Sequence, residues 1–334
     1  MNYLDAPFPW FGGKRRVAAD VWAAFGDVKN YVEPFFGSGA VLLGRPSAPH
    51  IETVNDADGL IANFWRSIKL SPAETAEWAD NPVNENDLHA RHAWLVGALA
   101  DLVPRLEGNP DFHDPKIAGW WVWGICCWIG GEFCSGKGPW SVVDGKLVRL
   151  GAGQGVKRKI VHLGRGQGVM RQRMHLGPCQ GVMRKRVHLE SWFAALSERL
   201  ARVSVCCGDW ARVCGHTPTF LQPGITGVFL DPPYADTARR DPTIYRVEST
   251  SLAHDVRVWA IEAGKRPDMR VALCGYEGEH EMPPEWRCHA WKTPGGYGNR
   301  AGNANRYRER IWFSPACLPV EVSAPESGPS RPQP

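Results

Sequence analysis

The amino-acid sequence predicts an α/β fold, a mixed and mostly parallel sheet with flanking helices, and three observations support this prediction. Short apolar segments alternate with segments of helical periodicity near both ends of the chain. Several of the apolar segments end at a glycine loop or at a carboxylate. The 334 residues, 43% of them hydrophobic, are enough for one large core or two modest ones.

The first 69 residues show this alternation most clearly. Apolar side chains recur with helical spacing from Leu60 to Ile68, after a segment that ends in acidic residues. In chain order, the predicted elements are strand 31–33, glycine loop 34–39, helix 40–43, strand 51–54 and helix 59–68.

Residues 70–140 are predicted to be helical. Ser71-Pro72-Ala73-Glu74 has the pattern of a capping box with proline at the first helical position, and Asp114 before Pro115 can start a second helix. The second helix carries four tryptophans, for which we expect core packing. These are Trp120, Trp121, Trp123 and Trp128.

Residues 151–189 contain an internal repeat. Gln-Gly-Val recurs with a spacing of 13 residues from Gln154, and a histidine follows eight residues after each glutamine. The segment 146–189 carries eleven Lys and Arg and no acidic residue. Because the repeat contains little apolar mass and several helix breakers, we expect extended surface loops or ribbons. A histidine spacing of 13 is not metal-ligand spacing, and we expect no metal.

Strand and helix alternate again between residues 190 and 313. The predicted elements are strand 227–230, helix 252–263, strand 270–274 and strand 310–313. The proline-rich tail 314–334 is expected to be disordered. The ten cysteines show no CxxC pair, so we expect free thiols packed mostly as small hydrophobic side chains.

Two motifs near the amino terminus indicate a nucleoside site. Gly37 and Gly39 let the backbone approach a ligand at the carboxyl edge of a sheet, where open α/β folds bind nucleosides. The third glycine of GxGxxG is missing, which argues against a nicotinamide-dependent oxidoreductase. Asp56 follows the second strand, where a carboxylate can bind ribose hydroxyls, and Asp58 is the candidate helix cap.

Asp231-Pro232-Pro233-Tyr234 directly follows an apolar strand and is the most specific motif in the chain. The two prolines fix the backbone between a carboxylate and an aromatic ring. The carboxylate and a nearby carbonyl can accept hydrogen bonds from an exocyclic amine while the ring stacks on a base. The motif therefore predicts a pocket for a planar amine.

Three segments resemble, in the same order, the motif series of the Dam-type DNA adenine methylases, the D12 class. They are PFPWFGGK from Pro7, EPFFGSGAV from Glu33 and DPPY from Asp231. Val54-Asn55-Asp56 resembles the ribose-binding segment of that family. Cys207-Gly208-Asp209-Trp210 resembles its GD-aromatic segment, with Trp where Phe is commoner. The similarity covers roughly residues 5–70 and 200–313.

The resemblance implies a Rossmann-like methyltransferase fold and S-adenosylmethionine as cofactor. By resemblance, the residues at the methionine end of the cofactor are Trp10, Gly12, Gly13 and Lys14. Those that shape the cofactor loop are Glu33, Pro34, Phe35, Gly37 and Gly39. Asp56 would take the ribose and Asp209 the cofactor adenine. The catalytic residues around the target adenine would be Lys14, Asp231, Pro232, Pro233 and Tyr234, with Asp231 also bordering the cofactor.

By the same resemblance, residues 1–69 and 190–313 form the catalytic domain and residues 70–189 a target-recognition insert. The basic segment suits contacts with DNA phosphates and base edges. Its candidate DNA-binding residues are Lys157, Arg158, Arg171, Arg173, Arg184, Lys185 and Arg186.

The expected function is site-specific methyl transfer to N6 of adenine in double-stranded DNA, with the base flipped out of the helix. The alternatives are transfer to cytosine N4 or RNA adenine, or an inactive DNA-binding accessory protein. No apolar run is long enough to span a bilayer and no signal peptide is evident, so we expect a cytoplasmic monomer or weak dimer. A phage or prophage origin and a restriction endonuclease partner stay open.

Overall fold

The computed structural model describes residues 4–8, 10, 14–47, 50–128, 133–134, 140–143, 146–149, 182–233, 252–291 and 308–320. For residues 140–143, 146, 147, 149 and 182–188 it describes the backbone alone.

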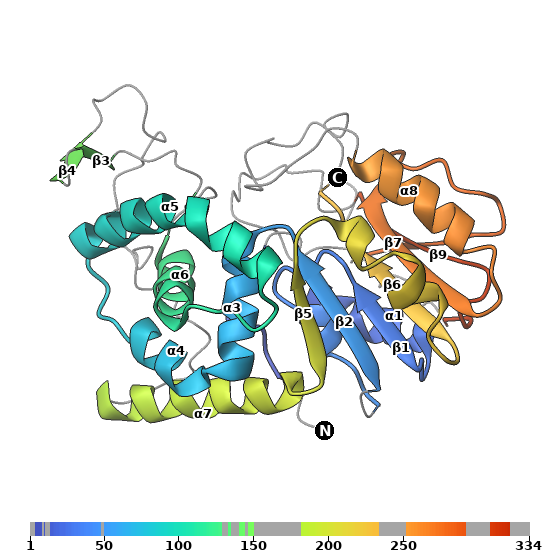
Figure 1. The fold of residues 1–334 in the computed structure, drawn as a ribbon. Coiled ribbons are helices and arrows are strands. Elements are labelled where there is room, and N and C mark those ends of the chain that lie inside the picture. Colours follow the sequence, from blue (N-terminus) through green and yellow to red (C-terminus); the bar gives the residue numbers. More distant parts are fainter. Residues whose placement is uncertain are drawn as a thin grey trace, which may run out of the picture.

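A seven-stranded sheet forms the centre of the molecule, in the order β5-β2-β1-β6-β7-β9-β8 (Figure 1). Its strands are β1 (Asn30–Glu33), β2 (Ile51–Asp56), β5 (Val203–Cys207), β6 (Thr226–Leu230), β7 (Met269–Tyr276), β8 (Arg287–Ala290) and β9 (Glu309–Phe313). The neighbouring strands β5, β2, β1, β6 and β7 pair in parallel, and β9 runs antiparallel to both β7 and β8. The predicted mixed, mostly parallel α/β fold is therefore confirmed.

Side chains point alternately to the two faces of the sheet along each central strand, so both faces carry apolar residues. Helices cover both of these faces. One face packs under α1 (Ala18–Phe25), α2 (Ala40–Leu43) and α3 (Gly59–Leu70), and the other under α8 (Leu252–Ala263). On the first face lie Tyr31, Phe229, Ala272 and Cys274, and on the second Val32, Val228, Leu230, Val271 and Leu273.

A group of helices lies beside the sheet at its β5 end (Figure 1). It contains α4 (Pro72–Ala79), α5 (Glu85–Gly108) and α6 (Pro115–Cys127), and α7 (Val182–Leu200) packs against α3 and α4. Phe64 of α3 contacts Trp121 and Phe193, with ring centroids 5.6 and 6.1 Å apart. These helices therefore share one hydrophobic core with the sheet. The remaining strands, β3 (Trp140–Val143) and β4 (Lys146–Arg149), form a separate antiparallel pair.

Helix caps confirm two of the predictions from sequence and contradict a third. Asp58 Oδ1 accepts from Leu60 N at 2.9 Å, and Asp114 Oδ1 accepts from Ile117 N at 2.9 Å. Ser71 precedes α4 but makes no side-chain cap. Its hydroxyl lies 2.8 Å from Nε2 of His113, so this tertiary hydrogen bond replaces the predicted capping box.

Two segments depart from the elements predicted for them. Residues 182–189 were expected in surface ribbons, yet α7 begins at Val182, and Leu189 and Phe193 are buried in the core. Residues 314–320 were expected in a disordered tail. They fold back instead, because Ser314 N bonds Val271 O at 2.9 Å and Leu318 N bonds Ala24 O at 2.8 Å.

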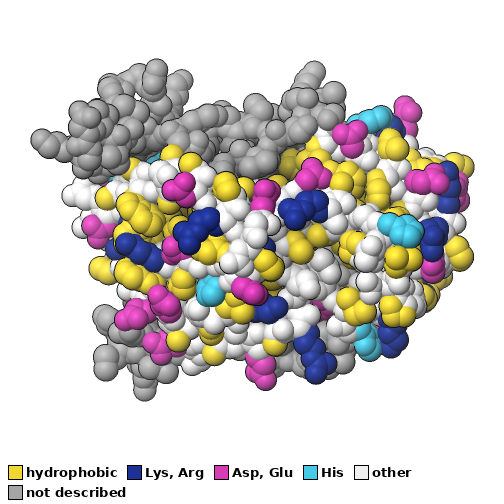
Figure 2. Space-filling view, in the orientation of Figure 1, with side chains coloured by type: hydrophobic (Ala, Val, Ile, Leu, Met, Phe, Trp, Pro, Cys, Tyr) yellow, Lys and Arg dark blue, Asp and Glu magenta, His cyan; other side chains and the backbone are white. Residues whose placement is uncertain are grey.

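Three of the four tryptophans predicted to pack in the core, Trp121, Trp123 and Trp128, are buried, and Trp120 is partly buried against it. The nine cysteines in the described part of the chain are all free thiols, as predicted, and seven of them are buried. No helix among the described residues is long and apolar enough to cross a bilayer. Figure 2 shows acidic and basic side chains interspersed over one face of the molecule, so the described part of that face carries no large patch of one sign.

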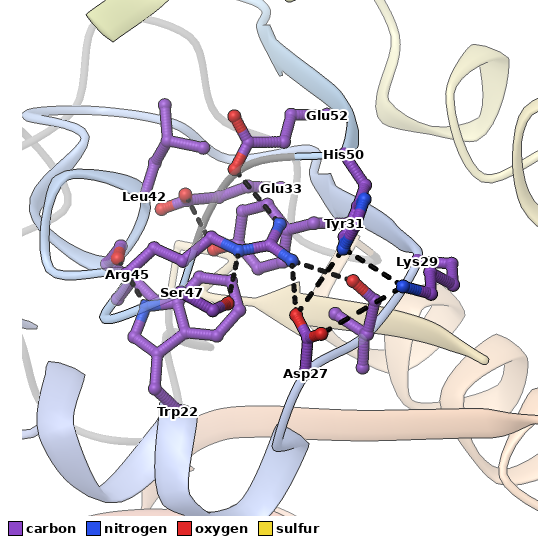
Figure 3. Close-up of polar contacts among 12 residues, drawn as sticks. Trp22, Asp27, Lys29, Tyr31, Glu33, Leu42, Arg45, Ser47, His50 and Glu52 are labelled. Atoms are coloured by element: carbon purple, nitrogen blue, oxygen red, sulfur yellow. Dashed lines mark hydrogen bonds and ion pairs between the residues drawn. The ribbon is translucent and has the colours of Figure 1, made fainter.

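A buried network of charges joins the end of α2, β2 and α7, and Figure 3 shows the part of it around Arg45 and Glu52. Nη1 of Arg45 lies 3.1 Å from Oε1 of Glu52, and neither side chain is exposed. Arg199 contacts the same carboxylate at 2.7 and 2.9 Å. Each guanidinium also donates to a backbone carbonyl, Val28 O for Arg45 and Leu42 O for Arg199. The buried Glu52 carboxylate therefore pairs with two cations, and Arg45 has a second, exposed carboxylate in Asp27, whose Oδ1 lies 3.5 Å from Nη2.

His92 in α5 is buried in its neutral form. Its ring stacks on Trp128, with centroids 4.9 Å apart and planes 8° from parallel, and Nδ1 accepts from Cys134 N at 3.1 Å. Burial, together with a smaller effect of the neighbouring His89, lowers the pKa of His92 to about 4. Because the unfolded chain takes up this proton near pH 6.5, stability is lost as the pH falls from there toward 4, by up to about 3 kcal/mol.

We therefore expect His92→Phe, which keeps the ring but cannot be protonated, to weaken this acid dependence. The variant is expected to be less stable than wild type at pH 7, by about 1–3 kcal/mol, because Cys134 N loses its acceptor. The difference should narrow between pH 6.5 and 4.5 in urea unfolding followed at each pH. A constant difference across this range would contradict the prediction.

Candidate active site

The polar residues singled out in the sequence gather at one edge of the sheet. Strands β1, β2, β5 and β6 run parallel, so their carboxyl ends lie side by side. The glycine loop follows β1, Asp56 ends β2, Asp209 follows β5 and Asp231 follows β6. We therefore take this edge as the candidate active site.

The glycine loop is tightly packed against aromatic side chains. Gly37 and Gly39 have φ values of +47° and +67°, a conformation that disfavours other residues. A Cβ atom on Gly37 would lie 2.5 Å from the indole nitrogen of Trp10, and one on Gly39 would lie 2.7 Å from the ring of Phe36. Trp65 Nε1 donates to Gly37 O at 2.8 Å. The loop conformation is thus fixed by packing as well as by its glycines.

Asp56 and Asn55 tie the strand ends together. Asp56 Oδ2 accepts from Gly37 N and Oδ1 from Asp58 N, both at 2.9 Å. The buried amide of Asn55 donates to Pro34 O at 3.1 Å and to Gly208 O at 2.9 Å. The carboxylate predicted to bind ribose therefore also holds the glycine loop, since each of its oxygens accepts a backbone N–H.

An aromatic pair lies at the β5 side of the edge. The rings of Phe35 and Trp210 stack with centroids 6.3 Å apart and planes 28° from parallel, and both are partly buried. Asp209 next to them is exposed, and its Oδ1 accepts from Ala211 N at 2.8 Å at the start of the 3-10 turn η3 (Trp210–Arg212). A carboxylate and a pair of rings thus lie together in reach of solvent.

Lys14 and Asp231 form a buried ion pair at the end of β6. Lys14 lies in the 3-10 turn η1 (Lys14–Arg16), is 5% exposed, and its Nζ is 2.9 Å from Asp231 Oδ1. Glu309 Oε2 lies 3.8 Å from the same Nζ, and the ring of Trp291 has its centroid 5.6 Å away. The ammonium group is therefore enclosed by two carboxylates and an aromatic face.

Glu33 lies beneath the glycine loop and is 2% exposed. Its Oε2 accepts from the Tyr31 hydroxyl at 2.8 Å. Burial raises the pKa of Glu33 well above its ordinary value, and the nearby Asp231 carboxylate raises it further. The Tyr31 hydrogen bond acts in the opposite direction without reversing the shift. Burial beneath the loop therefore favours the protonated form of Glu33.

We expect Glu33→Gln to stabilise the protein at alkaline pH. Native Glu33 keeps a proton that the unfolded chain releases near pH 4.5, so wild type loses stability as the pH rises from there to the native pKa. The glutamine variant keeps an acceptor for Tyr31 and has no proton to lose. Its advantage in Tm over wild type should therefore grow between pH 5 and 9, whereas Glu281→Gln, at an exposed position, should show no such trend. An advantage that is independent of pH would contradict this.

The structure brings most of the predicted residues together. Trp10, Lys14, Glu33, Phe35, Asp56, Asp209 and Asp231 all lie at or beneath the carboxyl edge, together with Pro34, Gly37, Gly39, Pro232 and Pro233. Gly12, Gly13 and Tyr234 lie outside the described residues, as do Lys157, Arg158, Arg171 and Arg173. Arg184, Lys185 and Arg186 fall in α7, where only the backbone is described.

Sequence reasoning missed Glu309 and Trp291. Glu309 begins β9, and because β9 is antiparallel to β7, its first residue lies opposite Tyr276 at the carboxyl edge. Nothing in the local pattern around Glu309 marks it as a site residue. Within the described part of the chain, no group of three or more His, Cys, Asp or Glu side chains is placed to hold a metal ion.

A family model matches the part of the chain that supplies the site residues from Trp10 to Asp56. The model of the D12 class N6 adenine-specific DNA methyltransferases matches residues 10–92, about a quarter of the chain. The match runs from Trp10 through Lys14, the glycine loop and Asp56 into α5. No curated protein matches the chain. The D12 class N6 adenine-specific DNA methyltransferase model is therefore found at residues 10–92, a stretch that contributes β1 and β2 to the mostly parallel seven-stranded sheet.

Proposed function

We propose that this protein transfers a methyl group from S-adenosylmethionine to N6 of a flipped adenine in double-stranded DNA. The observation that carries the proposal is the buried Lys14–Asp231 pair, which lies next to the glycine loop at the carboxyl edge of the sheet. Lys14 falls inside the range matched by the family model, whereas Asp231 is contributed by a strand outside that range.

The order of groups along the edge supports the proposed cofactor. Asp209, Asp56, the glycine loop and Asp231 follow the strand order β5-β2-β1-β6. The strand that precedes Asp209 and the strand that precedes Asp231 are separated by three strand spacings of about 4.8 Å, roughly 14 Å in all. An elongated nucleoside could therefore place its adenine at Asp209, its ribose at Asp56 and its reactive end at Asp231.

The chemistry of these groups fits S-adenosylmethionine. The exposed Asp209 carboxylate beside Phe35 and Trp210 offers an acceptor for an adenine amine next to aromatic faces. Asp56 is partly exposed, and carboxylate oxygens are the acceptors that ribose hydroxyls need. When bound, the cofactor supplies a methyl group on a sulfonium centre.

Asp231 would activate the target amine. Its carboxylate would accept a hydrogen bond from the adenine N6 amine and stabilise the positive charge that grows on nitrogen as the N–C bond forms and the methyl–sulfur bond breaks, the electron pair of that bond staying on sulfur. The carboxylate would then take the surplus proton from N6 and pass it to water. Pro232 and Pro233 fix the backbone after Asp231, which orients the amine toward the methyl group. Lys14 holds one oxygen of Asp231 in place. No covalent enzyme intermediate is required.

The basic segment is the proposed contact with DNA. Outside residues 146–189 the chain has 28 Lys and Arg against 35 Asp and Glu, so the excess positive charge lies within that segment. We expect replacement of Arg171, Arg173, Arg184 and Arg186 by Gln to weaken DNA binding and to flatten its salt dependence. Each lost phosphate contact removes about 0.7–0.9 from the slope of log K against log salt. An unchanged slope in anisotropy titrations would assign the segment another role.

The deciding experiment incubates the purified protein with unmethylated genomic DNA and labelled S-adenosylmethionine, followed by nucleoside analysis and mapping of modified bases. N6-methyladenine in a short recurring sequence is the expected product. Methylcytosine would move the assignment to cytosine N4. Cofactor binding without transfer to any DNA would favour an inactive DNA-binding protein.

A further inference from the structure

We propose that Glu309 is a positioning residue for methyl transfer, acting through Lys14 on Asp231. The inference rests on the proposed function. It adds a residue from β9, which is far in sequence from residues 10–92, the range that the family model matches. Glu309 is 4% exposed, and its Oε2 lies 3.8 Å from Nζ of Lys14. A carboxylate so deeply buried is costly unless a cation balances it.

The position of Glu309 follows from the antiparallel strand. Glu309 pairs with Tyr276, the last residue of β7, so its side chain reaches the edge where β6 delivers Asp231. The backbone N–H of Trp291 bonds Glu309 O at 3.4 Å, and the Trp291 ring closes the site against Lys14. The Lys14 ammonium is thus held from the β6 side by Asp231 and from the β9 side by Glu309.

The two contacts of Lys14 differ in kind. The 2.9 Å distance to Asp231 Oδ1 is a charge-assisted hydrogen bond, whereas the 3.8 Å distance to Glu309 is a longer attraction between charges. Glu309 therefore fixes the ammonium by its charge more than by a hydrogen bond. Without that charge, Lys14 can move toward Asp231, cover more of its carboxylate and compete with the target amine for it.

The test compares two variants that separate charge from shape. Glu309→Gln keeps the side-chain volume and removes the charge, while Glu309→Asp keeps the charge and shortens the side chain. We expect Glu309→Gln to lower kcat by about 10- to 100-fold, the range associated with a small misplacement of reacting groups. The KM values for DNA and for the methyl donor should stay near wild type. Glu309→Asp should retain more of kcat than Glu309→Gln.

A matched control lies close by in the sheet. Glu277→Gln removes an equivalent charge that pairs with Arg310 at 2.9 Å, at the same edge but 63% exposed, and it should leave kcat unchanged. Thermal unfolding is recorded for every variant, and kcat is compared where all are folded.

The outcomes separate this inference from the proposed function. The inference is overturned if the wild type is active and Glu309→Gln turns over like it, or retains more kcat than Glu309→Asp. Failure of Glu309→Gln to fold would assign the residue a structural role and would also overturn it. A wild type that transfers no methyl group to any DNA overturns the proposed function, and the inference falls with it.

Discussion

Replacing Asp231 by Asn is expected to lower the rate of methyl transfer about 100- to 1,000-fold while DNA binding persists. The side chain keeps its shape but loses the charge that would stabilise the cationic nitrogen during attack, and removal of one such preorganised group typically costs about 100- to 1,000-fold in kcat. The carboxylate faces Lys14 at the end of β6 and carries no DNA phosphate contact in this proposal. The measurement is the rate of label transfer from S-adenosylmethionine to DNA, with binding followed by fluorescence anisotropy.

Asp268→Asn is the matched control for this experiment. Asp268 is also paired with a cation, Arg266 at 2.8 Å, but is about half exposed and lies before β7, away from the carboxyl edge. It should leave turnover unchanged. Turnover by Asp231→Asn close to that of wild type would refute the role given to Asp231, and a parallel loss of DNA binding would instead indicate a disturbed fold.

Local patterns in the sequence were enough to predict the centre of the fold. The predicted helix 252–263 and the predicted strands 31–33, 227–230 and 310–313 match the structure within one residue at each end, because apolar runs next to glycine or a carboxylate are unambiguous. Asp58 and Asp114 were predicted as caps from their position alone and act as such. The residues of the candidate site were found because motif and strand end coincide.

Other features depend on contacts that no local pattern contains. The position of Ser71 before Pro72 is typical of a helix cap, yet its hydroxyl forms a hydrogen bond with His113, 42 residues away in the sequence. The start of α7 lies in a glycine-rich repeat, and this helix is held by the core it reaches at Leu189 and Phe193. Glu309 joins the site because strand pairing places it there, and pairing between distant strands is decided by the whole sheet.

Glu52→Ala is expected to be the most destabilising single replacement in the buried charge network, with a loss of about 3–5 kcal/mol. The reason is electrostatic, since Arg199 loses the carboxylate that it pairs with, and Arg45 stays fully buried against Trp22 with the exposed Asp27 carboxylate 3.5 Å away. Glu52→Gln, which fills the same volume, separates this cause from a cavity. If uncompensated charge dominates, urea unfolding will show that Gln restores only a minor part of the loss; if packing dominates, Gln will restore most of it.

Glu262→Ala, at an exposed ion pair with Lys265, should show no measurable loss. The network joins α2, which follows the glycine loop, to β2, which ends at Asp56, so a loosened network should also weaken cofactor binding although no member of it lies at the carboxyl edge.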